Sequence, residues 1–276
     1  MITLKAKIKD MATNNNFIVN AILTFVLSVF VSFRRLRLIL IYFDGKDWMH
    51  KWFGGLFVSN VPSLDPTKMN SENLKLFISM YKPRIGDVIV ELGAGNGTET
   101  YGLSKMVGNK GKVYAIEPDP ESFRRLVKLI SIGQLTNVEP LNVAISDQVG
   151  FAWLVENKEG SIGNWLANSS LESSFSRQVP TTTLDSLFTQ YNLRTVDYLK
   201  INIEGSEREA LKGFATHIDA VRNYCISCHD FLGRDESKTY DFVRNWLTQN
   251  NITPQVNPYE FVNNYRHFYV FAKNEK

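Results

Sequence analysis

The sequence predicts an α/β fold built on a mostly parallel sheet. From residue 87 onward, short apolar runs alternate with stretches of helical character, and the first run, 88–95, leads into a glycine-rich turn. Strands that alternate with helices in this way are typical of a parallel sheet covered by helices on both faces. The chain of 276 residues is long enough for one such domain and an appendage.

Composition and charge exclude several classes of protein. The net charge of +3 is small and the Lys and Arg residues are spread along the chain, so a nucleic-acid partner is not expected. The two cysteines are too few for a disulfide framework, which indicates a reducing compartment. We therefore expect a cytoplasmic protein.

The first 43 residues differ from the rest of the chain. Residues 17–33 contain no charged side chain, and basic residues flank this segment on both sides. The flanking residues are Lys5, Lys7, Lys9, Arg34, Arg35 and Arg37. A segment of this length is at the lower limit for crossing a bilayer.

A polar residue recurs at every fourth position of this segment. These residues are Asn16, Asn20, Thr24, Ser28 and Ser32. On a helix they would form one stripe, which favours a helix that lies in the membrane interface over one that crosses it. A helix docked on its own domain is the alternative. We expect 1–43 to be a helical extension and a candidate membrane anchor, with membrane contact through 17–43.

The next segment, 44–69, is dense in glycine and proline, which indicates a linker. The domain itself is expected to fill 70–276. Its first helix is expected over about 70–81, with Asn70 or Ser71 as the cap and Pro83 after its end. Further helices are expected at 98–107, 121–132, 184–190, 207–214 and 237–250.

Apolar runs between these helices predict the strands. They lie at 88–95, 112–118, 138–145, 196–205, 223–231 and 268–273. Residues 150–180 indicate a further hairpin followed by a polar loop. We expect these runs to belong to a seven-stranded, mostly parallel sheet.

The turn after the first strand reads Glu91-Leu92-Gly93-Ala94-Gly95-Asn96-Gly97. Glycine lets the backbone turn tightly and lets a ligand approach, and the next helix points its N-terminus at that ligand. A dinucleotide site would have its third glycine at position 98, where this chain has Thr98. Glu91 would repel a pyrophosphate, so the turn favours a cationic sulfonium and amino-acid ligand.

A second acid ends the second strand. The carboxylate of Glu117 can accept hydrogen bonds from both hydroxyls of a ribose, as an acid does at this place in nicotinamide-binding folds. An exposed turn acid is the alternative. Glu117 alone therefore does not distinguish between the two cofactors.

Five segments, taken in order, resemble the FkbM family of S-adenosylmethionine-dependent methyltransferases. They read VIVELGAGNGTET, VYAIEPDPESFRRL, NVAISDQVG, TTLDSLF and DYLKINIEGSEREALKGF. The resemblance covers about 70–235. It implies a Rossmann-like fold, S-adenosylmethionine as cofactor, and O-methylation of a hydroxyl on a glycan, a lipid-linked glycan or a secondary metabolite. The family usually has Asp at the positions of Glu91 and Asn202, and the second exchange removes a charge.

The resemblance also implies a set of cofactor-binding residues. They are Glu91, Gly93, Gly95, Gly97, Glu117, Ser146 and Asp147. The three glycines would line the methionine and ribose end, with Glu91 near the amino group and Glu117 on the ribose. Ser146 or Asp147 would bond the exocyclic amine of the adenine.

Two side chains at the carboxyl ends of central strands are candidates for the chemistry. Methyl transfer to oxygen needs a hydroxyl that is held in line and deprotonated by a base. Glu204 ends the fourth strand and His229 ends the fifth, at the edge where ligands bind in open α/β sheets. The alternative for Glu204 is a carboxylate that stabilises the turn after the strand. The alternative for His229 is a polar residue that is hydrogen-bonded at a strand end and has no role in the chemistry. Glu204, His229 and Asp230 could together bind a metal ion, but their spacing in the sequence is not that of a metal-binding motif. No metal is therefore predicted.

The segment Cys225-Ile226-Ser227-Cys228-His229 matches the C-x-x-C-H pattern of covalent haem attachment. On a strand, residues three apart point to opposite faces, so Cys225 and Cys228 could not serve one site. Neither haem nor zinc is therefore expected.

These observations favour an S-adenosylmethionine-dependent O-methyltransferase. A nicotinamide-dependent oxidoreductase is one alternative, and Thr98 counts against it. A non-catalytic, membrane-tethered binding module on the same fold is the other, and Asn202 would favour it. The acceptor pocket is expected to involve 150–180 and 232–262.

Overall fold

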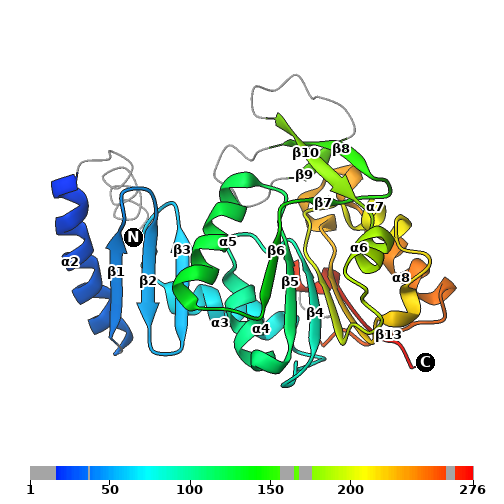
Figure 1. The fold of residues 1–276 in the computed structure, drawn as a ribbon, viewed down its shortest axis with the longest axis horizontal. Helices are drawn as coiled ribbons and strands as arrows, with labels where there is room; N and C mark the ends of the chain where they lie inside the picture. The colour runs from blue at the N-terminus through cyan, green and yellow to red at the C-terminus, as the bar shows by residue number, and fades with distance from the viewer. Residues whose placement is uncertain (1–16, 37, 156–164, 168–175, 259–264, 276) are drawn as a thin grey trace.

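The computed structural model describes residues 17–36, 38–155, 165–167, 176–258 and 265–275. Within these residues the strands form three sheets. A three-stranded sheet with helix α2 lies at one end of the molecule, beside the large central sheet, and a small four-stranded sheet lies above the central sheet in Figure 1.

The central sheet has seven strands in the order β13-β14-β12-β11-β4-β5-β6. They are β4 (Val88–Leu92), β5 (Lys112–Ile116), β6 (Val138–Leu141), β11 (Tyr198–Ile201), β12 (Asn223–Ser227), β13 (Thr253–Gln255) and β14 (Tyr269–Lys273). The strands from β12 to β6 run parallel, whereas β14 is antiparallel to β12 and β13 is antiparallel to β14. The predicted Rossmann-like, seven-stranded and mostly parallel sheet is confirmed.

Helices cover both faces of this sheet. One face carries α3 (Pro66–Phe77), α4 (Thr98–Val107) and α5 (Pro120–Gly133), and the other carries α6 (Leu184–Gln190), α7 (Glu207–Lys212) and α8 (Tyr240–Gln249). Alternate side chains of β4 enter the two cores, because Ile89 packs on the first face and Val90 and Leu92 on the second. Short 3-10 helices occupy Gly108–Lys110, Ile218–Ala220, Asp230–Leu232, Asp235–Ser237 and Tyr265–Phe268.

Around the central sheet, three differences from the prediction stand out. Helix α3 begins at Pro66 because Asp65 caps it, accepting a hydrogen bond from the N–H of Lys68 at 3.3 Å, and proline fits the first helical position. The expected strand over 138–145 is divided, and its end forms β7 (Ala144–Ile145) in another sheet. The pattern does not predict β13, a three-residue edge strand with a proline at its centre.

The small sheet has the order β7-β10-β8-β9. Its other strands are β8 (Gly150–Val155), β9 (Trp165–Ala167) and β10 (Ser176–Thr182). Strands β8 and β10 pair antiparallel, in keeping with the hairpin expected in 150–180. Leu154 and Val179 pack with Ala144 in a core of their own.

Residues 39–59 form the third sheet, which is antiparallel. Its strands β1 (Ile39–Phe43), β2 (Trp48–Trp52) and β3 (Gly55–Ser59) pair in chain order. The prediction of a linker over 44–69 is therefore wrong. The glycines in this segment serve a hairpin, where Gly54 has a φ of 80°. The helical extension over 1–43 holds for α2 (Phe17–Arg35), but the segment ends in strand β1.

Helix α2 covers the outer edge of β1 (Figure 1). The hydroxyl of Ser28 donates to the carbonyl of Ile41 at 3.0 Å and accepts from the N–H of the same residue at 2.9 Å. Ser32 makes the same pair of bonds with Ile39, at 3.1 and 2.9 Å. A strand at the edge of a sheet leaves backbone N–H and carbonyl groups without a partner. The two serine hydroxyls bond to these groups of β1 in place of a neighbouring strand. Among the helices in the described residues, none is long and apolar enough to span a membrane.

Asp47, between β1 and β2, ties the N-terminal sheet to α5. Its fully buried carboxylate accepts hydrogen bonds from Arg124 at 2.5 and 2.7 Å and from Arg125 at 3.0 Å, and it also pairs with Lys128. Burial acts to raise the pKa of Asp47, but the three cations outweigh it and hold the pKa well below the usual 3.8. The N-terminal sheet is thus joined to the central domain by buried charge.

Candidate active site

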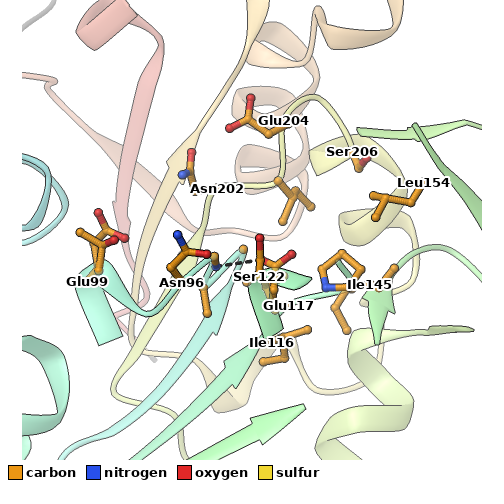
Figure 2. A pocket seen from close by; sticks show the side chains of 18 of the residues that line it. Asn96, Glu99, Ile116, Glu117, Ser122, Ile145, Leu154, Asn202, Glu204 and Ser206 are labelled. Atoms are coloured by element: carbon orange, nitrogen blue, oxygen red, sulfur yellow. Dashed lines mark hydrogen bonds between the residues drawn. The ribbon is translucent and has the colours of Figure 1, made fainter. Parts of the chain in front are cut away.

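A cavity lies where β4, β5 and β11 end (Figure 2). Its lining comes from the glycine turn after β4, the end of β5, the segment after β11 and the small sheet. In Figure 2, Glu117 lies between Asn96 and Glu99 on one side and Ile145 and Leu154 on the other. Segments that are far apart in the sequence therefore meet at the carboxyl edge of the sheet, as expected for a ligand site in this fold.

The glycine turn has a left-handed backbone, with φ values of 74° at Gly93, 56° at Gly95 and 85° at Gly97. A Cβ at Gly93 would lie 1.9 Å from the carbonyl oxygen of Asn202, so the fold itself requires glycine there. A Cβ at Gly97 would lie 2.9 Å from Leu126 of α5. Gly93 and Gly95 line the cavity, whereas Gly97 packs against α5 and is not among the lining residues.

Glu117 projects from the end of β5 into the cavity. Its Oε2 accepts a hydrogen bond from the N–H of Gly95 at 2.8 Å, and its Oε1 accepts one from the N–H of Asp119 at 2.9 Å. Each carboxylate oxygen retains capacity for a second bond. Burial raises the pKa of Glu117 to about 7, although the two N–H donors favour the charged form.

Glu91 is fully buried and does not line the cavity. It accepts a hydrogen bond from the hydroxyl of Thr100 at 2.7 Å and pairs with Lys200 Nζ at 3.2 Å. Lys200 also donates to the carbonyl of Gly93 at 3.1 Å, so this ion pair braces the glycine turn from behind. The resemblance implied that Glu91 would lie near the amino group of the cofactor. In the structure it lies behind the glycine turn and does not line the cavity.

Other lining residues have no signal in the sequence pattern. Glu99 is buried in the first turn of α4, and burial raises the pKa of its carboxyl group above 4.5 while Lys200 acts to lower it. The side-chain oxygen of Asn96 is buried and has no hydrogen-bond partner in the described part of the chain. Phe57 of β3 and Asn73 of α3 also line the cavity, so the N-terminal part of the chain contributes to its wall.

The opposite side of the cavity is mainly apolar. Ile145 of β7 and Leu154 of β8 line it, together with Ile116 at the end of β5. The predicted adenine ligands Ser146 and Asp147 come directly after β7 but do not line the cavity. Their side chains instead bond to each other, at 3.3 Å.

Glu204 lines the cavity and follows the end of β11. Its φ of 57° lies in the left-handed region, which is unusual for a residue with a side chain. Strand β11 ends at Ile201, so Glu204 lies in the turn that follows the strand. The backbone of this turn therefore sets the direction of the Glu204 carboxylate.

His229 does not line the cavity but lies between two carboxylates. Its Nδ1 is 2.8 Å from Glu207 Oε1, and its Nε2 is 3.6 Å from Glu204 Oε2. Burial acts to lower the pKa of His229, but Glu207 and Glu204 together raise it to about 10. The two carboxylates therefore favour the protonated imidazole, which is not the form that accepts a proton as a general base.

The two cysteines lie in separate cores. Cys225 packs with α3, α4 and α5, whereas Cys228 packs with α6, α7 and α8 on the other face of the sheet. The two thiols therefore lie on opposite faces of the sheet, as the alternation along the strand predicted. Within the described ranges, no three His, Cys, Asp or Glu side chains are grouped as metal ligands.

A parallel sheet with a glycine turn after one strand and a carboxylate at the end of the next defines a Rossmann-like protein that binds a nucleoside cofactor. Residues 91–253, more than half of the chain, match the family described as the methyltransferase FkbM domain. The chain belongs to the FkbM family of S-adenosylmethionine-dependent methyltransferases.

Solved structures with a similar fold include several methyltransferases. Methyltransferase FkbM from Methylobacillus flagellatus is 17% identical with a TM-score of 0.47, and the match covers 66% of this chain but 43% of that one. A SAM-dependent methyltransferase from Aquifex aeolicus is 19% identical with a TM-score of 0.42, over 75% and 93% of the two chains. Fibrillarin from Aeropyrum pernix, with natively bound S-adenosyl-L-methionine, is 13% identical with a TM-score of 0.43, over 82% and 94%. No curated protein matches the chain.

Proposed function

We propose that the protein transfers a methyl group from S-adenosylmethionine to a hydroxyl oxygen, with Glu204 as the general base. The observation that carries this proposal is that Glu204 lines the same cavity as the glycine turn and Glu117. S-adenosylmethionine supplies an electrophilic methyl group on a sulfonium. The residues of this chain hold the donor, orient the acceptor and accept its proton.

The cavity has the chemistry that this donor requires. Glu117 would accept hydrogen bonds from the ribose hydroxyls, and the apolar side formed by Ile116, Ile145 and Leu154 would pack on the adenine. The opposite side carries the buried carboxyl group of Glu99 and the unpartnered oxygen of Asn96, both suited to the ammonium of the methionine end. The family resemblance placed Glu91 near that ammonium, but Glu91 is already paired with Lys200.

His229 lies beside the proposed base. Its Nε2 is 3.6 Å from Glu204 Oε2, so the imidazole can hold the carboxylate in place at the cavity. As the oxygen–methyl bond forms and the sulfur–methyl bond breaks, the hydroxyl proton passes to Glu204. The products are a methyl ether and S-adenosylhomocysteine. We therefore assign His229 as a positioning residue.

Membership of the family removes the nicotinamide-dependent oxidoreductase from consideration. The non-catalytic binding module is the remaining alternative, because Asn202 lines the cavity at a position where the family usually carries an acid. The carbonyl of Asn202 approaches Gly93 closely, so the residue has a structural role whatever its side chain does.

We propose as acceptor a hydroxyl of a glycan, a lipid-linked glycan or a secondary metabolite, and we favour an acceptor at the cytoplasmic surface of a membrane. What supports a membrane-borne acceptor is the apolar N-terminal segment, which carries basic residues and no acid between residues 11 and 43.

The test is transfer of a labelled methyl group from the donor to glycan and lipid extracts by the full-length protein. We expect Glu204→Gln to lower turnover at least about tenfold while the affinity for the donor stays the same. Glu209→Gln, which removes a carboxylate of α7 outside the cavity lining, should leave turnover unchanged. If the wild type binds the donor but labels no acceptor, the protein is a binding module. If Glu204→Gln is fully active, the base lies elsewhere.

A further inference from the structure

Helix α2 exposes an apolar face. Phe25 is 72% exposed and Phe33 is 82% exposed. With them, this face contains Ile22, Val26, Val29 and Phe30, and we call these six residues the docking face. Contiguous apolar surface of this kind marks an interaction site in soluble proteins.

The orientation of the helix is fixed from its other side. Leu23, Leu27 and Val31 are buried against β1 and β2, and the hydroxyls of Ser28 and Ser32 complete the edge of β1. The polar stripe is therefore turned inward, the reverse of what an interfacial helix on its own would adopt. Rotation of α2 to hide its phenylalanines would break the hydrogen bonds of Ser28 and Ser32.

Charge indicates what covers this face. Residues 1–43 contain six Lys or Arg residues and one Asp, a net charge of +5, whereas the whole chain carries +3. Arg34 and Arg35 form the last turn of α2, and no acidic residue lies in the helix. An apolar face on a helix that ends in two arginines, within a segment of net positive charge, fits the surface of an anionic bilayer.

A groove beside the docking face leads toward the donor cavity. Arg34 lines this groove, as do the ion pairs of Arg35 with Asp65 and of Lys68 with Glu72, and Thr98 lines both the groove and the cavity. A lipid headgroup with negative charge would meet Arg34 at this groove.

We propose that the docking face seats the enzyme on an anionic lipid bilayer, with α2 in the plane of the interface and its phenylalanines among the acyl chains. This deepens the membrane-borne acceptor of the proposed function, but it rests on the surface of α2 and not on the methyl-transfer chemistry. Contact without crossing is consistent with the absence of a spanning helix among the described residues.

The test is co-flotation of the full-length protein with vesicles of phosphatidylcholine alone or of equal parts phosphatidylcholine and phosphatidylglycerol. The full chain is required, because removal of α2 and β1 would uncover the edge of β2. We expect binding to the mixed vesicles and at least about tenfold weaker binding for the double variant Phe25→Ser, Phe33→Ser. Arg34→Gln should weaken binding to anionic vesicles about fivefold.

Phe151→Ser is the matched control, because Phe151 is 74% exposed and lies on β8, away from α2 (Figure 1). It should bind vesicles as the wild type does, and all variants should keep the wild-type unfolding temperature and donor affinity. The proposal is overturned if the wild type does not float, if the double variant floats equally well, or if light scattering shows a dimer that the double variant dissociates. In each case intact donor binding would leave the methyl-transfer proposal standing.

Discussion

His229 illustrates how neighbouring charges set the role of a single residue. The side chain is 2% exposed and lies between Glu207 and Glu204. Since its pKa is raised to about 10, the wild-type activity should show no inflection near 6.5 from histidine titration. A rate that rises through pH 6.5 and loses this step in His229→Gln would show that His229 acts as the base.

The same residue links stability to pH. A histidine whose pKa is raised from 6.5 to about 10 contributes stability that is fully present below 6.5 and is lost as pH rises through 10. We expect His229→Gln to lower the free energy of unfolding at pH 7 by about 3 kcal/mol, because it leaves Glu207 buried without its cation. Chemical denaturation at pH 7 and at pH 10 measures this, and the difference between variant and wild type should shrink at the higher pH.

At the level of elements, the serines of α2 carry the hydrogen bonds of a missing strand. Ser28→Ala and Ser32→Ala each leave a backbone N–H and carbonyl of β1 without their partner, at a cost of about 1–3 kcal/mol. Hydrogen exchange at the amides of Ile39 and Ile41 should accelerate correspondingly. Thr24→Ala is the control, because the Thr24 hydroxyl donates to a carbonyl of its own helix, that of Asn20. Unchanged exchange in both serine variants would contradict the role of the helix as an edge cover.

The elements also show what a sequence can predict. The glycine turn, β4 and α4 were predictable because their signals are local: apolar residues, then glycines, then a helix start. The strands β1 to β3 were not predictable, because no local motif marks them and only their pairing in the folded chain defines them. The start of α3 was also missed, because Pro66 resembled a loop residue although it begins the helix. Glu99 and Glu207 were missed because their roles depend on burial and on their position in the folded chain, where Glu207 pairs with His229, and no spacing in the sequence predicts these.

At the level of the whole molecule, Asp47 holds two parts together. Asp47→Asn removes the carboxylate that pairs with Arg124, Arg125 and Lys128, and we expect a loss of about 3 kcal/mol in the free energy of unfolding at pH 7. The pKa of Asp47 is lowered, so its contribution is present above 3.8 and fades as pH falls below that value.

Denaturant titrations at neutral pH and below pH 3.8 check this prediction, and the variant should approach the wild type at the lower pH. Asp44→Asn is the matched control, because Asp44 is more exposed and bonds Lys128 alone among these cations, so its loss should cost less than about 1 kcal/mol. Equal losses for the two variants would contradict a special role for the buried carboxylate.

The central claim is that the cavity at the end of β4 and β5 binds S-adenosylmethionine with Glu117 on its ribose. The most direct measurement is calorimetric titration of the donor into the full-length protein and into Glu117→Ala, at several pH values on either side of 7. We predict one donor per chain, an affinity lower by about 1–3 kcal/mol in the variant, and wild-type affinity that rises with pH through about 7 as Glu117 ionises. Absence of binding, or equal affinity in a folded Glu117→Ala variant, would contradict this account.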